Sequence, residues 1–256
     1  PTLMPLAVRL QHLEALGVAW VWILPFTQAF ARITAEQFVQ RILVDRLHAA
    51  VLIVGERFAF GHDRAGNPSV LQRLGAPHGM QVVLLRHIHQ GGRPISSSRI
   101  RDAIVRGQLT QSKQLLGRPA CFYGVVVRGA GRGRTLGVPT INVQVRAAVT
   151  PPDGVYAVRV HRCEERRATN GVRRAHTSGV SLGTGWGGVM NLGVRPTFGP
   201  GPRVCEVHLL NTPGTPLGVS VCVSVLARLR AERSFHTSAA LVAQIRRDIR
   251  CARRIL

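Results

Sequence analysis

The stretch GRPACFYGVVV (residues 117–127) marks the point where the sequence changes its periodicity. Before it, helical and strand patterns alternate. After it, short apolar segments follow one another, separated by glycine and proline. Six such segments predict a small antiparallel barrel that follows a boundary near 117–118. The predicted strands are residues 121–127, 140–145, 155–161, 188–192, 204–210 and 219–226.

Residues 1–117 have the pattern of an α/β domain. Leu6, Leu10 and Leu13 recur at helical spacing before Gly17, and Thr34 is placed to cap a second helix that runs to residue 47. Helix and strand alternation of this kind predicts a parallel sheet with crossover helices. A buried strand is expected at 18–24, further strands at 50–54 and 81–85, and closing helices at 98–106 and 110–116.

The last part of the barrel domain, residues 118–256, ends in a predicted helix. One apolar stripe indicates it, and either Thr237 or Ser238 is its expected cap. Residues 162–187 are polar and lack periodicity, which predicts a long exposed hairpin loop. The stripe consists of Leu241, Ile245, Ile249, Ala252 and Leu256. The predicted fold class is therefore α/β followed by all-β.

Composition excludes several classes of protein. The chain has 256 residues, 45% of them apolar and 18% charged, which is typical of a globular protein. A net charge of +22 invites a nucleic-acid interpretation. However, Lys113 is the only lysine, and the arginines are scattered over every segment instead of gathering on one face. We therefore expect weak, non-specific affinity for polyanions and no specific nucleic-acid partner.

Apolar runs, signal-peptide patterns and cysteines indicate the cellular setting of the protein. No run of 18 apolar residues occurs, so no membrane span is expected. No signal-peptide pattern occurs either, and a chain that starts at Pro1 is expected to be processed, trimmed or part of a longer reading frame. Five cysteines without a C-x-x-C pair indicate free thiols in a reducing cytoplasm.

The stretch GRGRTLGVPTINV (131–143) suggests phosphate chemistry. Thr140 and Asn142 are two residues apart on a predicted strand, so their oxygens face the same side. Two neutral oxygens suit Mg²⁺ bound to a phosphate, and a glycine-rich loop lets backbone N–H groups approach phosphate oxygens. The loop residues concerned are Gly131, Gly133, Arg134 and Gly137. The same pattern also fits a plain glycine-rich hairpin.

A carboxylate in a later strand adds to this interpretation. In VCEVHLL (204–210), alternation places Cys205 and Val207 on one face and Glu206 and His208 on the other. A carboxylate near a metal and a hydroxyl can serve as a general base, although a strand residue that simply faces solvent fits equally well. With Lys113 as the only lysine, neither a Walker loop nor the protein-kinase lysine is available.

Taken together, these motifs resemble the bacterial bifunctional riboflavin kinase/FAD synthetase family. The matches to the kinase half are specific and lie in the family's order. Upstream, VGERFAFG (54–61) and ISSSRIR (95–101) look like nucleotidyltransferase motifs. The kinase-half motifs are GRGRTLGVPTIN (131–142), PPDGVYAV (151–158), GVMNLGVRPTF (188–198), CEVHLLN (205–211) and LRAERSFHTSAALVAQIRRD (229–248).

The resemblance implies a six-stranded Greek-key barrel with the terminal helix packed beside it. It also implies transfer of the γ-phosphoryl group of ATP to the 5′-hydroxyl of riboflavin, giving FMN. Thr140 and Asn142 would hold Mg²⁺ and phosphate, Glu206 would be the base, and Arg230 would lie at the flavin. Asn191 and residues 195–197 match a further motif that equally suits barrel packing.

In the first half the resemblance is partial. It implies an incomplete Rossmann-like adenylyltransferase domain, because the family's first strand and its H-x-G-H-type loop have no counterpart after Pro1. We therefore expect that this chain does not convert FMN to FAD at a useful rate, although a full-length parent would. The residues that match adenylyltransferase motifs are Gly55, Phe60, Gly61, Ser97, Ser98 and Arg101.

Three functions thus stay open at this stage. The leading one is a flavin kinase that uses riboflavin, ATP and Mg²⁺. A non-catalytic fragment with a folded barrel is the second, and an arginine-rich nucleic-acid binder is the third. The third lacks a stacking platform, since only 5% of the residues are aromatic.

Overall fold

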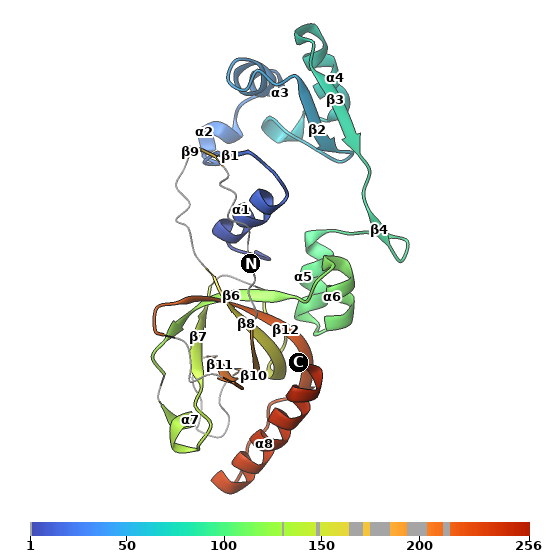
Figure 1. Cartoon of the computed structure of the whole chain (residues 1–256). Helices are drawn as coiled ribbons and strands as arrows, with labels where there is room; N and C mark the ends of the chain where they lie inside the picture. Colours follow the sequence, from blue (N-terminus) through green and yellow to red (C-terminus); the bar gives the residue numbers. More distant parts are fainter. Residues whose placement is uncertain are drawn as a thin grey trace. The chain divides into compact units, whose positions relative to one another are not determined.

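The computed structural model describes residues 2–129, 131–146, 149–163, 171–174, 185–193, 204–211 and 216–256 (Figure 1). The chain folds as two compact units. One contains residues 2–21 together with nearly all described residues from 96 onward, and the other is centred on residues 22–95. Residues 96–117 therefore pack with the barrel, whereas the domain boundary at 117–118 stays a prediction from the sequence.

A closed antiparallel barrel forms the larger unit, as predicted. Its strands follow one another around the barrel in the order β10-β11-β7-β6-β12-β8. Strand β11 pairs with β7, and β12 inserts between β6 and β8, which is Greek-key connectivity. The strands are β6 (Cys121–Val127), β7 (Ile141–Val145), β8 (Gly154–Arg162), β10 (Trp186–Gly193), β11 (Val204–Leu209) and β12 (Ser220–Arg230).

Alternating side chains fill the interior of the barrel. Val158, Val160, Val207, Val221 and Val223 are all 0% exposed and belong to one apolar core. Successive residues of a strand point to opposite faces, so the residues between the inward ones lie on the outer surface. The outer surface is therefore where the polar residues of β11 and β10 are found.

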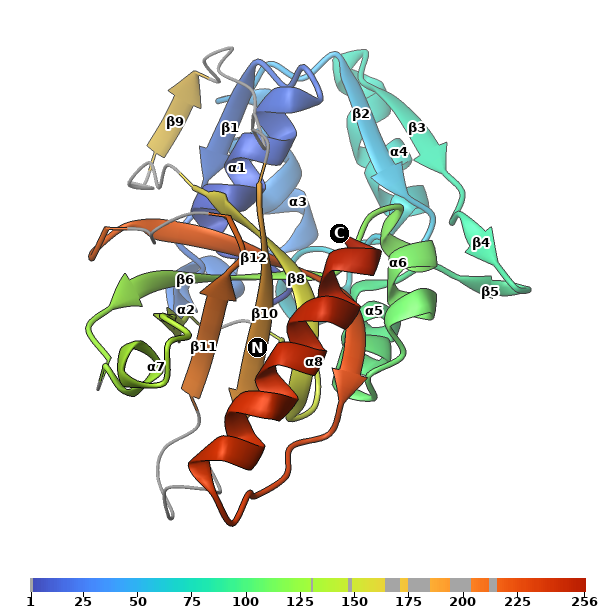
Figure 2. The same ribbon diagram turned by 60° about the horizontal axis from the view of Figure 1, so that its bottom comes forward.

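Helix α8 (Ser238–Ile255) packs on the outside of the barrel against β8, β10 and β12 (Figure 2). Thr237 caps it, because its hydroxyl accepts the N–H of Ala240 at 3.1 Å. Ala252 is fully buried against Val155 and Val189. The predicted terminal helix and its packing beside the barrel are both confirmed.

The remaining elements of this unit are short. Helices α5 (Ser97–Val105) and α6 (Leu109–Leu116) pack against each other, close to the ranges predicted for them. Helix α1 (Leu6–Ala15) ends before Gly17, which has a left-handed φ of 83°. The four-residue helix α7 (Arg132–Thr135) lies inside the glycine-rich loop.

The unit around residues 22–95 is α/β. Its parallel strands β2 (Val51–Gly55) and β3 (Gln81–Leu85) confirm the predicted crossover arrangement. Thr34 and Gln37 form a capping box at the start of α3 (Ala35–Phe38). The helix then continues as a π-helix over Val39–Val44 instead of as a regular α-helix. The other elements are α2 (Gln28–Ala31), α4 (Pro68–Gly75), the 3₁₀ turns His62–Arg64 and Ala76–His78, β4 (His89–Gln90) and β5 (Arg93–Pro94).

Two expectations need correction. The apolar run 18–24 was expected as a buried strand, but β1 covers only Trp20–Ile23 and Trp20 is 58% exposed. An apolar run predicts extended backbone but does not say what will cover it. The segment 162–187 is not all loop: β8 includes Arg162, β9 (Gly171–Arg174) lies within it, and β10 starts at Trp186. Residues 164–170 and 175–184 of this segment lie outside the described residues.

Across the described ranges, no helix is both long enough and apolar enough to cross a membrane.

Candidate functional site

Three polar side chains form one row on the outer surface of the barrel. Glu206 of β11 lies directly opposite Asn142 of β7 on one side and Asn191 of β10 on the other. Directly opposed residues of antiparallel strands point to the same face, with Cβ atoms about 4.5–5.5 Å apart. Cys205 and Val207, which flank Glu206, are buried inside the barrel, so the row faces outward. The two residues predicted to share a site, Asn142 and Glu206, are thus neighbours.

Thr140 stands just before β7, outside this row. One residue, Ile141, lies between it and Asn142. His208, two residues after Glu206 on β11, donates from Nδ1 to the carbonyl oxygen of Pro139 at 2.8 Å. This hydrogen bond joins the chain before Thr140 to the strand that carries Glu206. The segment before Thr140 and the strand of the candidate base are therefore tied to each other.

The glycine-rich loop is a compact turn that lies beside Thr140. Gly131 and Gly137 adopt left-handed φ angles of 73° and 71° at either end of α7. The N–H groups of Arg134, Gly137 and Val138 already donate to carbonyl oxygens within the loop, at 3.0, 3.1 and 2.8 Å. The loop therefore has a defined shape by itself and is not the freely deformable segment that its composition suggests.

Two glycines allow the loop to lie directly on the predicted ligands. A Cβ on Gly133 would come within 2.5 Å of the Val138 carbonyl oxygen and 3.0 Å of the Thr140 hydroxyl oxygen. A Cβ on Gly129 would come within 1.9 Å of Nδ2 of Asn142. Gly129 was not singled out from the sequence. Its position between strand β6 and the loop was the only available signal, and its need for close approach appears only in the fold.

Arg230 occupies the same register level farther around the barrel. Val155 of β8 pairs with Asn191 on one side and with Arg230 of β12 on the other, where β12 shifts its register. The Arg230 side chain forms an ion pair with Asp248 of α8 at 3.0 Å and lies over the ring of Phe235. Its side chain is 19% exposed. The predicted flavin contact is thus a guanidinium that already anchors α8.

A second carboxylate also contacts the row. Nδ2 of Asn191 donates to Oε1 of Glu232 at 3.2 Å, and a Cβ on Gly193 would come within 2.2 Å of the Glu232 carboxyl carbon. Glu232 therefore fixes the orientation of the Asn191 amide beside Glu206. Residues 195–197, which complete the motif predicted around Asn191, lie outside the described residues.

The nature of the donors decides which metal this face could hold. Throughout the described parts of the chain, no group of three or more His, Cys, Asp or Glu side chains is arranged to hold a metal ion. The predicted site offers something else, namely the hydroxyl of Thr140 and the amide of Asn142, with the carboxylate of Glu206 opposite Asn142. Such a set suits Mg²⁺, which prefers oxygen ligands and takes several of them from water and nucleotide phosphates.

The residues matched to adenylyltransferase motifs are distributed over both units. Phe60 is 7% exposed and exchanges two backbone hydrogen bonds with Gly66, at 3.1 and 2.9 Å. Gly61 has a left-handed φ of 74°, and a Cβ there would come within 2.7 Å of the Ala35 nitrogen. Gly55 ends β2 in this same unit.

The other three matched residues belong to α5 in the barrel unit. Ser97 and Ser98 open this helix, Arg101 lies within it, and Ser96 caps it by accepting the N–H of Arg99 at 3.3 Å. Each group is therefore a local structural feature of its own unit.

Comparison with known proteins finds two family models along the chain. A family model described as riboflavin kinase matches residues 116–256, and one described as FAD synthetase matches residues 1–99. The bifunctional riboflavin kinase/FMN adenylyltransferase of Escherichia coli (strain K12) is 35% identical over 245 residues, which make up 96% of this chain and 72% of that protein. The protein of the same description from Pseudomonas fluorescens is 36% identical over 238 residues, covering 93% and 70% of the two chains.

A solved structure extends the likeness to the fold. The crystal structure of a protein described as a macrolide-efflux protein from Streptococcus pneumoniae superimposes with a TM-score of 0.79 at 27% sequence identity. The match covers 98% of this chain and 75% of that one.

Proposed function

The chain belongs to the bifunctional riboflavin kinase/FMN adenylyltransferase family, and we propose on that premise that its barrel transfers the γ-phosphoryl group of ATP to riboflavin. The product is FMN. The observation that supports this most directly is the register of β7 against β11, which sets Asn142 opposite Glu206. Phosphoryl transfer needs a phosphate loop, a metal-binding edge and a base at one place, and this face supplies residues for all three.

In this proposal Thr140 and Asn142 hold Mg²⁺, which neutralises charge on the phosphate oxygens when it is bound. Glu206 accepts the proton of the ribityl 5′-hydroxyl while the oxygen of that hydroxyl forms a bond to the γ-phosphorus. The bond between that phosphorus and the bridging oxygen breaks, and ADP leaves with the electron pair. His208 keeps the segment before Thr140 in place through its bond to Pro139.

The rest of the face orients the substrates. The turn from Gly131 to Gly137 would cover the phosphates, with Arg134 adding positive charge. Asn191, oriented by Glu232, can offer its amide to the flavin chain or to Glu206. Arg230 would contact flavin with its remaining guanidinium donors while Asp248 holds it in place.

Formation of FMN from riboflavin, ATP and Mg²⁺ tests this function. The Glu206→Gln variant keeps the size of the side chain but removes the base, so kcat should fall by about 10²- to 10⁴-fold with little change in KM. The exposed Glu36→Gln change on α3 is the matched control and should leave turnover unaltered. If the wild-type protein forms no FMN, the proposed function is wrong. If the wild type forms FMN and Glu206→Gln retains full turnover, the function stands but the assignment of the base is wrong.

The metal ligands have a separate test. The Thr140→Ala variant should require a much higher Mg²⁺ concentration for half-maximal rate, because it removes one of the two side-chain oxygens. Circular dichroism spectra that match the wild type would show that the barrel is intact. An unchanged Mg²⁺ requirement would contradict the assignment of Thr140.

The same assay can follow FAD. Curated relatives are named for both reactions, and the sequence led us to expect that this chain does not make FAD at a useful rate. Detectable FAD from FMN and ATP would contradict that expectation. The working compartment we propose is the cytoplasm, since all five cysteines are free thiols.

A further inference from the structure

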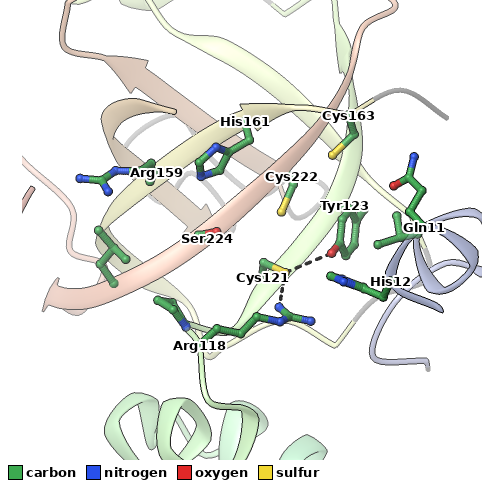
Figure 3. A pocket seen from close by; sticks show the side chains of 13 residues that line it. Gln11, His12, Arg118, Cys121, Tyr123, Arg159, His161, Cys163, Cys222 and Ser224 are labelled. Atoms are coloured by element: carbon green, nitrogen blue, oxygen red, sulfur yellow. Dashed lines mark hydrogen bonds between the residues drawn. The ribbon is translucent and has the colours of Figure 1, made fainter. Parts of the chain in front are cut away.

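A cavity of about 200 Å³ lies on the outer face of β6, β12 and β8, with α1 as its other wall (Figure 3). Cys121 and Tyr123 of β6 and Cys222 of β12 line the barrel side, and Val8 and His12 line the helix side. All these residues belong to the same compact unit. The cavity is therefore a feature of one folded body.

The cavity is separate from the proposed kinase face. The strands of the barrel follow the order β10-β11-β7-β6-β12-β8, so the row on β10, β11 and β7 and the cavity on β6, β12 and β8 occupy opposite arcs. None of the residues assigned to phosphoryl transfer lines the cavity. A ligand here would leave the kinase row accessible.

The thiols of β6 and β12 are neutral near pH 7, while Arg159 of β8, which also lines the cavity, donates from Nη2 to the carbonyl oxygen of Leu256 at 2.7 Å. A hydrogen bond with Cys121 works to lower the pKa of Cys222, but a hydrogen bond with Cys163 and burial outweigh it and raise that pKa to about 12. The hydrogen bond with Cys222, followed by burial, raises the pKa of Cys121 well above its usual range. Thiols in this state are weak nucleophiles and act as small apolar groups. This wall therefore suits an apolar ligand body.

Arg118 supplies a cation at the edge of this apolar wall. Its Nη1 donates to Sγ of Cys121 at 3.2 Å, and Figure 3 shows the guanidinium beside Cys121 and His12. Among the described residues no carboxylate forms an ion pair with Arg118. A thiol is a weak acceptor, so the guanidinium retains donors for a planar carboxylate, which it can bind through two parallel hydrogen bonds.

His12 adds a second polar atom without a partner. Its Nε2 is buried, and in the described part of the chain it has no hydrogen-bond partner. Burial and the positive charge of Arg118 lower the pKa of His12, so the ring is neutral near pH 7. A neutral imidazole can carry its proton on Nε2 and donate it to an acceptor that also contacts Arg118.

The size of the cavity sets the size of the ligand. An engineered apolar cavity of about 150 Å³ binds benzene, so a space of about 200 Å³ accepts one ring with a small substituent. We propose that this cavity binds a small carboxylate with an apolar, ring-sized body, the carboxylate on Arg118 and His12 and the body against the thiol wall.

Benzoate, benzamide and inorganic phosphate are the probes that test this proposal. In calorimetric titration benzoate should bind with one site per chain. Benzamide, which has the same shape but no charge, should bind at least about tenfold more weakly because it cannot pair with Arg118. Phosphate, which lacks the apolar body, should also be weaker. Equal affinities for benzoate and benzamide, or no saturable benzoate binding, would overturn the proposal.

Two variants locate the site. Arg118→Gln should weaken benzoate binding at least about tenfold, whereas Arg253→Gln, an exposed arginine on α8, should leave it unchanged. Ser224→Leu fills the cavity from the β12 wall and should abolish binding while the FMN-forming rate stays at the wild-type value. If Ser224→Leu binds benzoate as the wild type does, the ligand lies elsewhere and the assignment is wrong.

Discussion

The barrel and the α/β unit are built from similar apolar strands and bury them very differently. Val158 and Val160 in β8 are 0% exposed, whereas Ile53 in β2 is 63% exposed and Leu85 in β3 is 55% exposed. A Val/Leu/Ile-rich composition therefore does not determine burial. What differs is whether the strand belongs to a closed sheet.

Closure explains the contrast in physical terms. Each barrel strand has hydrogen-bonded neighbours on both sides, and the interior is sealed by side chains from all six strands. The parallel pair β2 and β3 packs Leu52, Val54 and Val82 into a small core, but its opposite face is open in the described residues. Parallel sheets are usually covered on both faces, so we expect this unit to be the less stable of the two.

The largest effect of this difference should appear in hydrogen exchange. Backbone amides of β8 and β10 should exchange at least about 100-fold more slowly than those of β2 and β3, because the closed sheet opens only with global unfolding. Exchange measured by mass spectrometry on peptides from the intact chain gives both rates in one sample. Similar protection in the two sheets would show that the exposed face of β2 and β3 does not lower local stability.

The next largest difference should be in the free energy of unfolding that a side-chain truncation removes in each unit. Leu192→Ala removes a side chain that is 2% exposed in the barrel core and should lower the free energy of unfolding by about 2–5 kcal/mol. Ile53→Ala removes a mostly exposed side chain and should cost less than about 1 kcal/mol. Urea denaturation of both variants tests this, and a large loss for Ile53→Ala would mean that its face is covered in solution.

Burial should also determine how much an ion pair contributes to the free energy of unfolding. Asp248 is 6% exposed at its side chain and pairs with Arg230, so Asp248→Asn should cost about 1–3 kcal/mol. Asp102 of α5 pairs with Arg106, and its side chain is 57% exposed. Asp102→Asn should therefore lower the free energy of unfolding by at most about 0.5 kcal/mol. If Asp248→Asn also raises the KM for riboflavin, the proposed flavin contact of Arg230 gains support.

The smallest effect should be a pH dependence confined to the barrel unit. The pKa of His12 is lowered from 6.5 by burial and by Arg118, so the unfolded chain binds more protons below that pH than the folded one. Stability of this unit should therefore fall as the pH drops below about 6.5, and His12→Gln should remove that part of the slope. Thermal unfolding from pH 7 to pH 5 measures it, and an unchanged slope in the variant would contradict the assignment. The other titratable groups that line the cavity are Arg118, Cys121, Tyr123, Arg159, His161, Cys163 and Cys222.

Local sequence determined much of this protein. The spans of the barrel strands, the cap at Thr237, the capping box at Thr34 and the parallel pair β2–β3 all follow from short-range patterns, because periodicity and side-chain capping depend on neighbours in the chain. For the same reason strand spacing predicts a shared direction for Thr140 and Asn142, which stays a prediction. The motifs also identified the family, since each one is a contiguous run of residues.

Only the tertiary structure decided which of these pieces meet. Glu206 lies opposite Asn142 because β11 pairs with β7, a strand far from it in sequence, and no periodicity encodes that choice. Three other features arise in the same way: the compact shape of the glycine-rich loop, the ion pair between Arg230 and Asp248, and the cavity that Arg118 and His12 both line. Each depends on the closure of the barrel and on what packs outside it, and these are set by the total burial of the chain and not by any one segment.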